Sequence, residues 1–277
     1  MFGVHIDSDP INICNEIEKY HNDGCKVVQL FIDPFYKRKI EYDIFKTYAN
    51  INKIHIVVHI SYVINCAQRW DYHSWWIKQF IMEIESAKKL GAFAVVIHLG
   101  KQLDMTREEA INNMLTSLIY VHDQTRLTHV KILIETSSGQ GSEMCYKLND
   151  FAYFFNKFSN HKSNEIRDRF GICLDTCHIF AAGYDIRTTD VIKTYLDSFE
   201  EMVGIKYIKL IHLNDSKKDL GSYVDRHHNI GRGFIGKVGL KTIIKFFGKL
   251  NVPMILETPD DHMKEDINVT RKTLTSY

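Results

Sequence analysis

Histidine and carboxylate side chains recur along this chain where apolar runs end. Histidine is frequent, with 14 residues among 277. A single histidine or glutamate at a strand end is more often a hydrogen-bonded rim residue or the partner of an arginine. Six in succession, separated by 37 to 45 residues, favour one shared site instead. These six residues are His59, His98, Glu135, Asp175, His212 and Glu257.

Their side-chain types point to a metal centre. Three carboxylates buried together are costly unless cations neutralise them. Imidazole nitrogens and carboxylate oxygens without thiolates are typical ligands of Zn²⁺, ahead of Mn²⁺ or Fe²⁺. Zinc lowers the pKa of bound water toward about 7, which makes hydroxide available at neutral pH.

Two short clusters enlarge the set. His178 follows Asp175 by three residues, which places both side chains on one side of a first helical turn. Asp225 and His227 lie two apart on one side of an extended loop, whereas His228 faces away. Nine ligands exceed the needs of two tetrahedral ions that keep open positions, so we expect three zinc ions per chain with Glu135 bridging. The predicted ligands are His59, His98, Glu135, Asp175, His178, His212, Asp225, His227 and Glu257.

The elements that must position these residues form a repeated pattern. Eight short apolar runs, several of them β-branched throughout, suit strands covered on both faces, as in parallel sheets. They span residues 2–6, 26–32, 53–59, 93–98, 130–135, 170–175, 206–212 and 253–257. Segments of helical period follow at 11–20, 71–90, 106–126, 147–158, 188–203, 238–249 and 263–276, and Gly91 is a predicted helix C-cap.

This alternation predicts an α/β fold, a single (β/α)8 TIM barrel over residues 1–277, with the active site at the C-terminal ends of the strands. An open doubly wound sheet is the alternative. The glycine-rich phosphate turn of a dinucleotide-binding fold, however, is missing after the first run.

Composition excludes several classes of protein. A formal charge of +1 gives no broad electrostatic footprint for nucleic acid, so any such binding must use local patches. The six cysteines form no CxxC pair and are expected to be reduced. With no signal peptide and no apolar run long enough to span a membrane, we expect a soluble intracellular protein, in cytoplasm, nucleus or a viral particle.

The residues around the predicted ligands resemble those of a known family. The Asp-Thr-Cys-His block at 175–178 and the His-Leu-Asn-Asp block at 212–215 are highly specific. Further matching segments lie at 59–65, 97–100, 135–142, 173–178, 225–231 and 256–258. In this order, and over nearly the whole chain, they resemble the endonuclease IV family of apurinic/apyrimidinic (AP) endonucleases, also called AP endonuclease family 2.

The resemblance implies a function and an assignment of the ligands. The substrate would be double-stranded DNA containing an abasic site, cleaved 5′ to that site to leave a 3′-hydroxyl and a 5′-deoxyribose phosphate. The enzyme is also expected to trim blocked 3′ ends. It is expected to be a monomer and not to bind membranes. The catalytic residues would be Glu135, Asp175 and Glu257. The first zinc would use His59, His98 and Glu135. The second would use Glu135, Asp175, His212 and Glu257, and the third His178, Asp225 and His227.

The resemblance also suggests DNA contacts. Tyr62, with Val63 beside it, is similar to the family's aromatic wedge, although a rim aromatic is the alternative. In the loop at 33–39 the family's DNA-penetrating arginine is replaced, with Tyr36 as the candidate substitute. Basic residues expected to contact phosphates, or else to form a solvated loop surface, are Lys37, Arg38, Lys39 and Arg232.

Two other functions fit parts of the pattern. A metal-dependent sugar isomerase or epimerase of the same barrel type would leave His178, Asp225 and His227 surplus, because such enzymes use one or two ions. A non-catalytic DNA-binding protein with structural zinc is the other alternative.

The chain departs from the resembled family at two positions beside the ligands. Leu99 and Thr136 stand where proline and asparagine are frequent in that family, and neither change removes a ligand.

Overall fold

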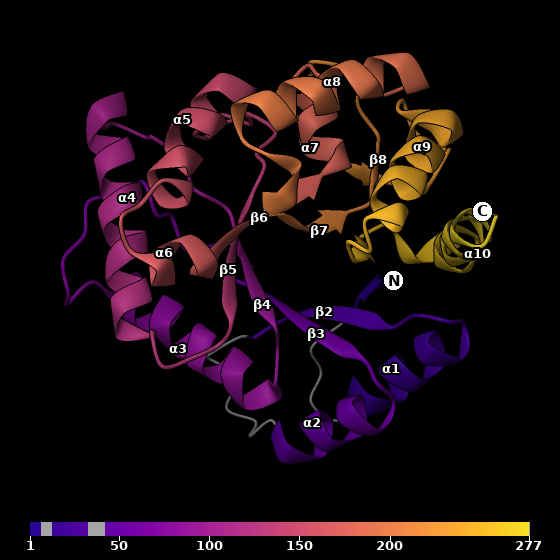
Figure 1. Cartoon of the computed structure of the whole chain (residues 1–277), viewed down its shortest axis with the longest axis horizontal. Helices are drawn as coiled ribbons and strands as arrows, with labels where there is room; N and C mark the ends of the chain where they lie inside the picture. The colour runs from indigo at the N-terminus through magenta and orange to yellow at the C-terminus, as the bar shows by residue number, and fades with distance from the viewer. Residues whose placement is uncertain (7–12, 33–41, 277) are drawn as a thin grey trace.

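Parallel strands close into a barrel in the computed structural model, which describes residues 1–6, 13–32 and 42–276 (Figure 1). The closed order is β1-β10-β7-β6-β5-β4-β3-β2, and every neighbouring pair is parallel. The strands are β1 (Phe2–His5), β2 (Val27–Phe31), β3 (His55–His59), β4 (Ala94–Ile97), β5 (Lys131–Glu135), β6 (Phe170–Asp175), β7 (Ile208–His212) and β10 (Met254–Leu256). Each predicted apolar run contains one of them, which confirms the predicted TIM barrel.

Helices surround the barrel on its outside (Figure 1). They are α1 (Ile13–Asn22), α2 (Tyr42–Ile51), α3 (Trp75–Leu90), α4 (Arg107–Gln124), α5 (Leu148–Ser159), α6 (Asn164–Arg169), α7 (Thr176–Ala181), α8 (Thr189–Met202), α9 (Gly236–Lys249) and α10 (Met263–Leu274). Two short 3₁₀ turns, η1 (Ile205–Tyr207) and η2 (Asp260–His262), precede β7 and α10. Gly91 ends α3 with φ 77°, the left-handed conformation expected of a C-cap glycine.

Some short elements, and one helix of ordinary length, were not predicted. The helix α6 contains six residues, and β8 (Asp215–Ser216) and β9 (His227–His228) only two, too few for a periodic pattern to be recognised. Of the six-residue helix α7, only the first turn after Asp175 was expected. The helix α2 is longer, and its sequence signal is the four-residue spacing of the buried Phe45 and Ala49.

The barrel carries apolar side chains on both faces of its strands. Inward-facing side chains fill the interior, and a larger cluster packs between strands and helices. The interior residues, all buried, are Val27, Val57, Ala94, Val96, Leu133, Cys173, Leu210 and Ile255. Because this interior is packed and not a pore, the residues at the strand ends rest on a rigid base.

All six cysteines are free thiols. Among the helices of the described residues, none is long and apolar enough to cross a membrane.

Candidate metal centre at the mouth of the barrel

The side chains of the nine predicted ligands come together at the C-terminal ends of the strands. Four are the last residues of β3, β5, β6 and β7, and two follow β4 and β10 directly. The remaining three come from α7 and from the hairpin β8–β9 with its connecting loop. In the described part of the chain, several triplets of His, Cys, Asp and Glu at this mouth could hold a metal ion. The chain therefore has the side chains needed to use metal ions.

Glu135 divides its two oxygens between two groups of side chains. Its Oε2 lies 3.2 Å from Nε2 of His59 and 3.1 Å from Nε2 of His98. Its Oε1 lies 2.8 Å from Nδ1 of His212. The carboxylate is buried at the end of β5, and each of its oxygens faces a different group of predicted ligands.

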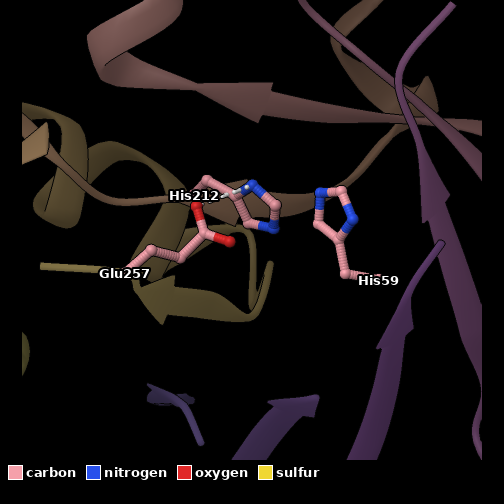
Figure 2. A group of neighbouring side chains, drawn as sticks. All are labelled: His59, His212 and Glu257. Carbon is pink, nitrogen blue, oxygen red and sulfur yellow. Dashed lines mark ion pairs between the residues drawn. The ribbon is translucent and has the colours of Figure 1, made fainter. Parts of the chain in front are cut away.

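The second group surrounds His212. Nδ1 of His212 lies 3.2 Å from Oε2 of Glu257 and 3.9 Å from Oδ2 of Asp175. Figure 2 shows the carboxylate of Glu257 directed at the ring of His212, with the ring of His59 alongside. The two rings are stacked, with centroids 5.9 Å apart. The groups around His59 and His212 are therefore adjacent within one site.

The third group lies around Asp225. Its Oδ2 is 3.2 Å from Nε2 of His178, and its Oδ1 is 3.2 Å from Nε2 of His227. Nε2 of His227 is also 3.6 Å from Oδ2 of Asp175. This third group is therefore in contact with the second.

Local structure explains why the third group forms. Asp175 is the N-cap of α7 and its Oδ1 accepts a hydrogen bond from the backbone N–H of His178 at 2.8 Å. This cap turns His178 toward the mouth, as the three-residue spacing predicts. The backbone N–H of Asp225 donates to Oε1 of Gln140 at 3.0 Å, which ties the loop between β8 and β9 to the loop after β5.

Backbone carbonyls orient two of the imidazoles. Nδ1 of His59 lies 2.8 Å from the carbonyl oxygen of Ile60, and Nδ1 of His178 lies 2.8 Å from that of Thr136. A carbonyl oxygen only accepts, so in each ring Nδ1 carries a proton and Nε2 is the nitrogen that faces the site. Such outer contacts select the tautomer that binds a metal. Thr136, a departure from the resembled family, also accepts from the backbone N–H of Asp175 through its hydroxyl at 3.0 Å.

Three polar residues of the site were not predicted from the sequence. The amide oxygen of Gln29 lies 2.8 Å from Nε2 of His212, and its Nε2 donates to Glu257 at 2.7 Å and contacts Nδ1 of His5 at 3.0 Å. Asn214 donates to Oδ2 of Asp175 at 2.8 Å and to Glu257 at 3.1 Å. The sequence signal for Gln29 is a glutamine inside an apolar run, and that for His5 is a histidine next to the end of the first run, which the structure makes the last residue of β1.

The carboxylates dominate the electrostatics of the mouth. Burial alone would lower the pKa of His212, but Glu257 and Glu135 outweigh it and raise this pKa to about 9. At His227, Asp175 and Asp225 likewise outweigh burial and raise the pKa to about 9. Without metal, protons on these rings supply positive charge that bound cations would otherwise provide.

Unpartnered nitrogens test whether the third group fits a metal ion. Among the described residues, the buried Nε2 atoms of His178 and His227 have no hydrogen-bond partner, although each lies 3.2 Å from an oxygen of Asp225. A tetrahedral zinc with bonds of about 2.0–2.2 Å separates its ligands by roughly 3.3–3.6 Å. The spacing, and two ring nitrogens that would exchange a proton for a metal ion, therefore fit an ion held between these three side chains.

The predicted DNA contacts have different surroundings. Tyr62 is 65% exposed, with its ring centroid 5.1 Å from that of His59, and Val63 beside it is 56% exposed. Arg232 forms an ion pair with Glu265 at 3.0 Å. His228 faces a separate pocket with Lys217, Lys218, Arg226 and Arg232. Tyr36, Lys37, Arg38 and Lys39 lie outside the described residues.

Comparison with known proteins decides the family. Residues 17–275 match the family model described as xylose isomerase-like TIM barrel. The probable endonuclease 4 of Petrotoga mobilis is 36% identical over 229 residues, which cover 82% of this chain and 78% of that protein. The chain belongs to the endonuclease IV family. The apurinic-apyrimidinic endonuclease 1 of Schizosaccharomyces pombe is 37% identical over 220 residues, covering 78% of this chain and 62% of that protein.

Solved structures agree with membership of the endonuclease IV family. Endonuclease IV from Thermus thermophilus superposes with a TM-score of 0.81 and 25% identity, covering 100% of this chain and 99% of that one. A D-tagatose 3-epimerase-like protein reaches a TM-score of 0.75 at 16% identity, over 99% of this chain and 96% of that one, which reflects the shared barrel alone. The predicted family and hydrolytic nuclease activity are therefore confirmed over the sugar isomerase alternative.

Proposed function

We propose that this endonuclease acts on double-stranded DNA at abasic sites, with three zinc ions held by the nine side chains at the barrel mouth. The reaction is hydrolysis of the phosphodiester 5′ to the abasic nucleotide. Water adds to phosphorus and the P–O3′ bond breaks. The departing oxygen takes a proton, leaving a 3′-hydroxyl and a 5′-deoxyribose phosphate.

The observation that carries this proposal is the division of Glu135 between two groups of side chains. One oxygen faces His59 and His98, and the other faces His212. The third group, around Asp225, lies next to Asp175 of the second. Three adjacent groups with one shared carboxylate support three ions, which a sugar isomerase with one or two ions does not need.

The ligand chemistry favours zinc. All nine side chains offer nitrogen or carboxylate oxygen, and three groups of four or fewer donors suit an ion that prefers low coordination numbers. When bound, zinc ions supply hydroxide near neutral pH and positive charge that neutralises an anionic phosphate.

The chain's own residues have distinct tasks in this reaction. Glu135, Asp175 and Glu257 hold negative charge at fixed positions, because their oxygens accept hydrogen bonds or face imidazoles from several strands. Ile60 and Thr136, through their carbonyls, keep His59 and His178 in one tautomer. The packed barrel below keeps these atoms in place as the phosphate enters, so little reorganisation is needed.

Recognition of the damage depends on the deformability of the DNA. An abasic nucleotide has lost stacking and pairing, so it leaves the helix at lower cost than an intact one. Tyr62, with Val63 beside it, is the proposed wedge that fills the vacated stack, which its exposure beside the ring of His59 supports. Arg232, Lys37 and Arg38 are proposed contacts to the DNA backbone, and Tyr36 is the proposed substitute for the family's DNA-penetrating arginine.

An incision assay tests the proposal. The substrate is a 5′-labelled duplex with one tetrahydrofuran abasic analogue, and the control is the same duplex without it. We expect zinc-loaded protein to cut only the abasic strand, and a DNA polymerase to extend the product from its 3′-hydroxyl. A chelator should stop the reaction and added zinc should restore it. Zinc-loaded protein that leaves the abasic duplex intact would contradict the proposal.

Two further parts of the proposal concern the 3′ end and the assembly. The same site should remove blocking groups from 3′ termini, because the scissile bond is again a phosphodiester or phosphomonoester at O3′. Residues 1–277 are proposed to act as one domain and as a monomer, which light scattering on a sizing column would check.

A further inference from the structure

A second polar cavity lies at the end of the barrel opposite the metal centre. It encloses about 240 Å³ and is lined by the end of α4 and by residues that lead into β5 and β6. The metal centre lies where β5 and β6 end, so the two sites are at opposite ends of the same strands. Nothing in the proposed nuclease reaction uses this cavity.

A buried arginine, Arg169, lines the cavity, and the carboxylate that acts on it, Glu85, does so from beyond salt-bridge distance. Arg169 is only 7% exposed, yet it forms no ion pair with a carboxylate among the described residues. Its NH1 donates to the carbonyl oxygens of Thr125 and Thr128 at 3.2 and 2.7 Å, and its NH2 donates to the hydroxyl of Thr125 at 2.9 Å. The Nε–H of this guanidinium is left without a partner in the described structure. Buried guanidinium groups are normally paired with an anion.

Two more buried atoms around the same cavity have no partner in the described part of the chain. They are the hydroxyl oxygen of Thr128 and Nδ1 of His122. Both side chains are more than nine-tenths buried, with 4% exposure each. Buried polar atoms are nearly always satisfied, so three unsatisfied ones around one cavity indicate a missing group.

The charges around the cavity favour an anion. Arg126 and Lys131 add two cationic side chains to that of Arg169. Glu165 and Asp168 also line it, but both are exposed, and neither pairs with Arg169. Burial lowers the pKa of Arg169 to about 10, which leaves the guanidinium charged at neutral pH.

We propose that this cavity binds a phosphate group, held by Nε of Arg169, the hydroxyl of Thr128 and Nδ1 of His122. All three atoms can donate a hydrogen bond, and a tetrahedral oxyanion offers acceptors in several directions. The phosphate could belong to inorganic phosphate or to a nucleotide, and the two sources are separated below.

Amide chemical shifts of the zinc-loaded, ¹⁵N-labelled full chain provide the test. Inorganic phosphate is titrated at constant ionic strength, and the shifts of Thr128 and Lys131 report on this cavity and not on the metal centre. Thr128→Val removes the hydroxyl and keeps the backbone carbonyl that Arg169 uses. Thr194→Val, on the exposed face of α8, is the matched control.

We expect saturable shifts in the wild-type chain and in Thr194→Val, with a dissociation constant about tenfold higher in Thr128→Val. Arg169→Lys, which keeps the charge but lacks Nε–H, should weaken binding similarly if it folds. If dAMP binds more tightly than inorganic phosphate, the site is assigned to nucleotides. If dAMP binds equally tightly or more weakly, the site is assigned to free phosphate. No saturable shift, or an unchanged constant in Thr128→Val, would overturn the proposal and leave Arg169 as a clamp on the α4–β5 connection.

Discussion

Nδ1 of His212 lies 2.8 Å from Oε1 of Glu135, while Nε2 of the same ring lies 2.8 Å from the amide oxygen of Gln29. The amide oxygen can only accept, so Nε2 carries the proton and Nδ1 is the nitrogen that faces the carboxylates. Glu135, at the end of β5, thereby meets an imidazole whose orientation is set by a residue of β2 on the other side of the barrel. The ligands are held by contacts across the whole mouth.

Metal content tests the three groups. We expect about three zinc ions per chain in protein purified without chelator. Asp225→Asn removes the carboxylate between His178 and His227 and should lower the content to about two. Asp219→Asn, an exposed substitution in the same β8–β9 connection, should keep about three. Inductively coupled plasma mass spectrometry measures the ratio, and one ion per wild-type chain would refute the trinuclear assignment.

Glu257→Gln tests the role of the carboxylate after β10. Gln29 and Asn214 both donate to Glu257, so an amide nitrogen there would meet donors, and the negative charge would be lost. We expect incision of abasic duplex to fall by at least about 10³-fold, with DNA affinity nearly unchanged.

For Glu257→Gln, single-turnover kinetics measure the rate of incision, and fluorescence anisotropy measures the affinity for DNA. Glu108→Gln, exposed in the first turn of α4, is the control and should retain wild-type activity. Full activity in Glu257→Gln would remove this residue from the site.

Tyr62→Ala tests the proposed wedge. Loss of an aromatic contact with a base costs about 1–3 kcal/mol, so affinity for abasic duplex should fall by about tenfold or more. Affinity for intact duplex should change less, because a closed stack leaves no gap for the ring to fill. Tyr153→Ala, with similar exposure on α5, should alter neither affinity. Equal losses on both duplexes would indicate a nonspecific contact.

Gln29→Leu tests the contact that orients His212. Leucine preserves the approximate volume but removes both the acceptor for His212 and the donor to Glu257. Loss of such an outer contact typically lowers metal affinity or activity by about 10–100-fold. Competition with a chromophoric chelator measures zinc affinity. The rate of incision at saturating zinc shows whether turnover is affected apart from the loss of zinc. Gln124→Leu, at the exposed end of α4, is the control. Unchanged zinc affinity and unchanged incision would show that His212 needs no help from Gln29.

Much of the fold could be predicted because strands and ligands coincide. Each apolar run contains a barrel strand, and His59, Glu135, Asp175 and His212 are the last residues of theirs. In a parallel barrel, residues at that position must converge whatever their separation along the chain. The α2 helix and the β8–β9 hairpin were missed, since one depends on two spaced apolar residues and the other on strands of two residues.

The sequence by itself determined that the nine predicted ligands meet at the mouth, because ligand type and strand periodicity are local properties. Only the tertiary structure decided how they are oriented. Gln29 reaches Glu257 across 228 positions of the chain, and Arg169 leaves its Nε unpaired beside Thr128 and His122. Such contacts depend on which strands become neighbours and on which polar atoms remain without a partner. Neither property is encoded in a local pattern of residues.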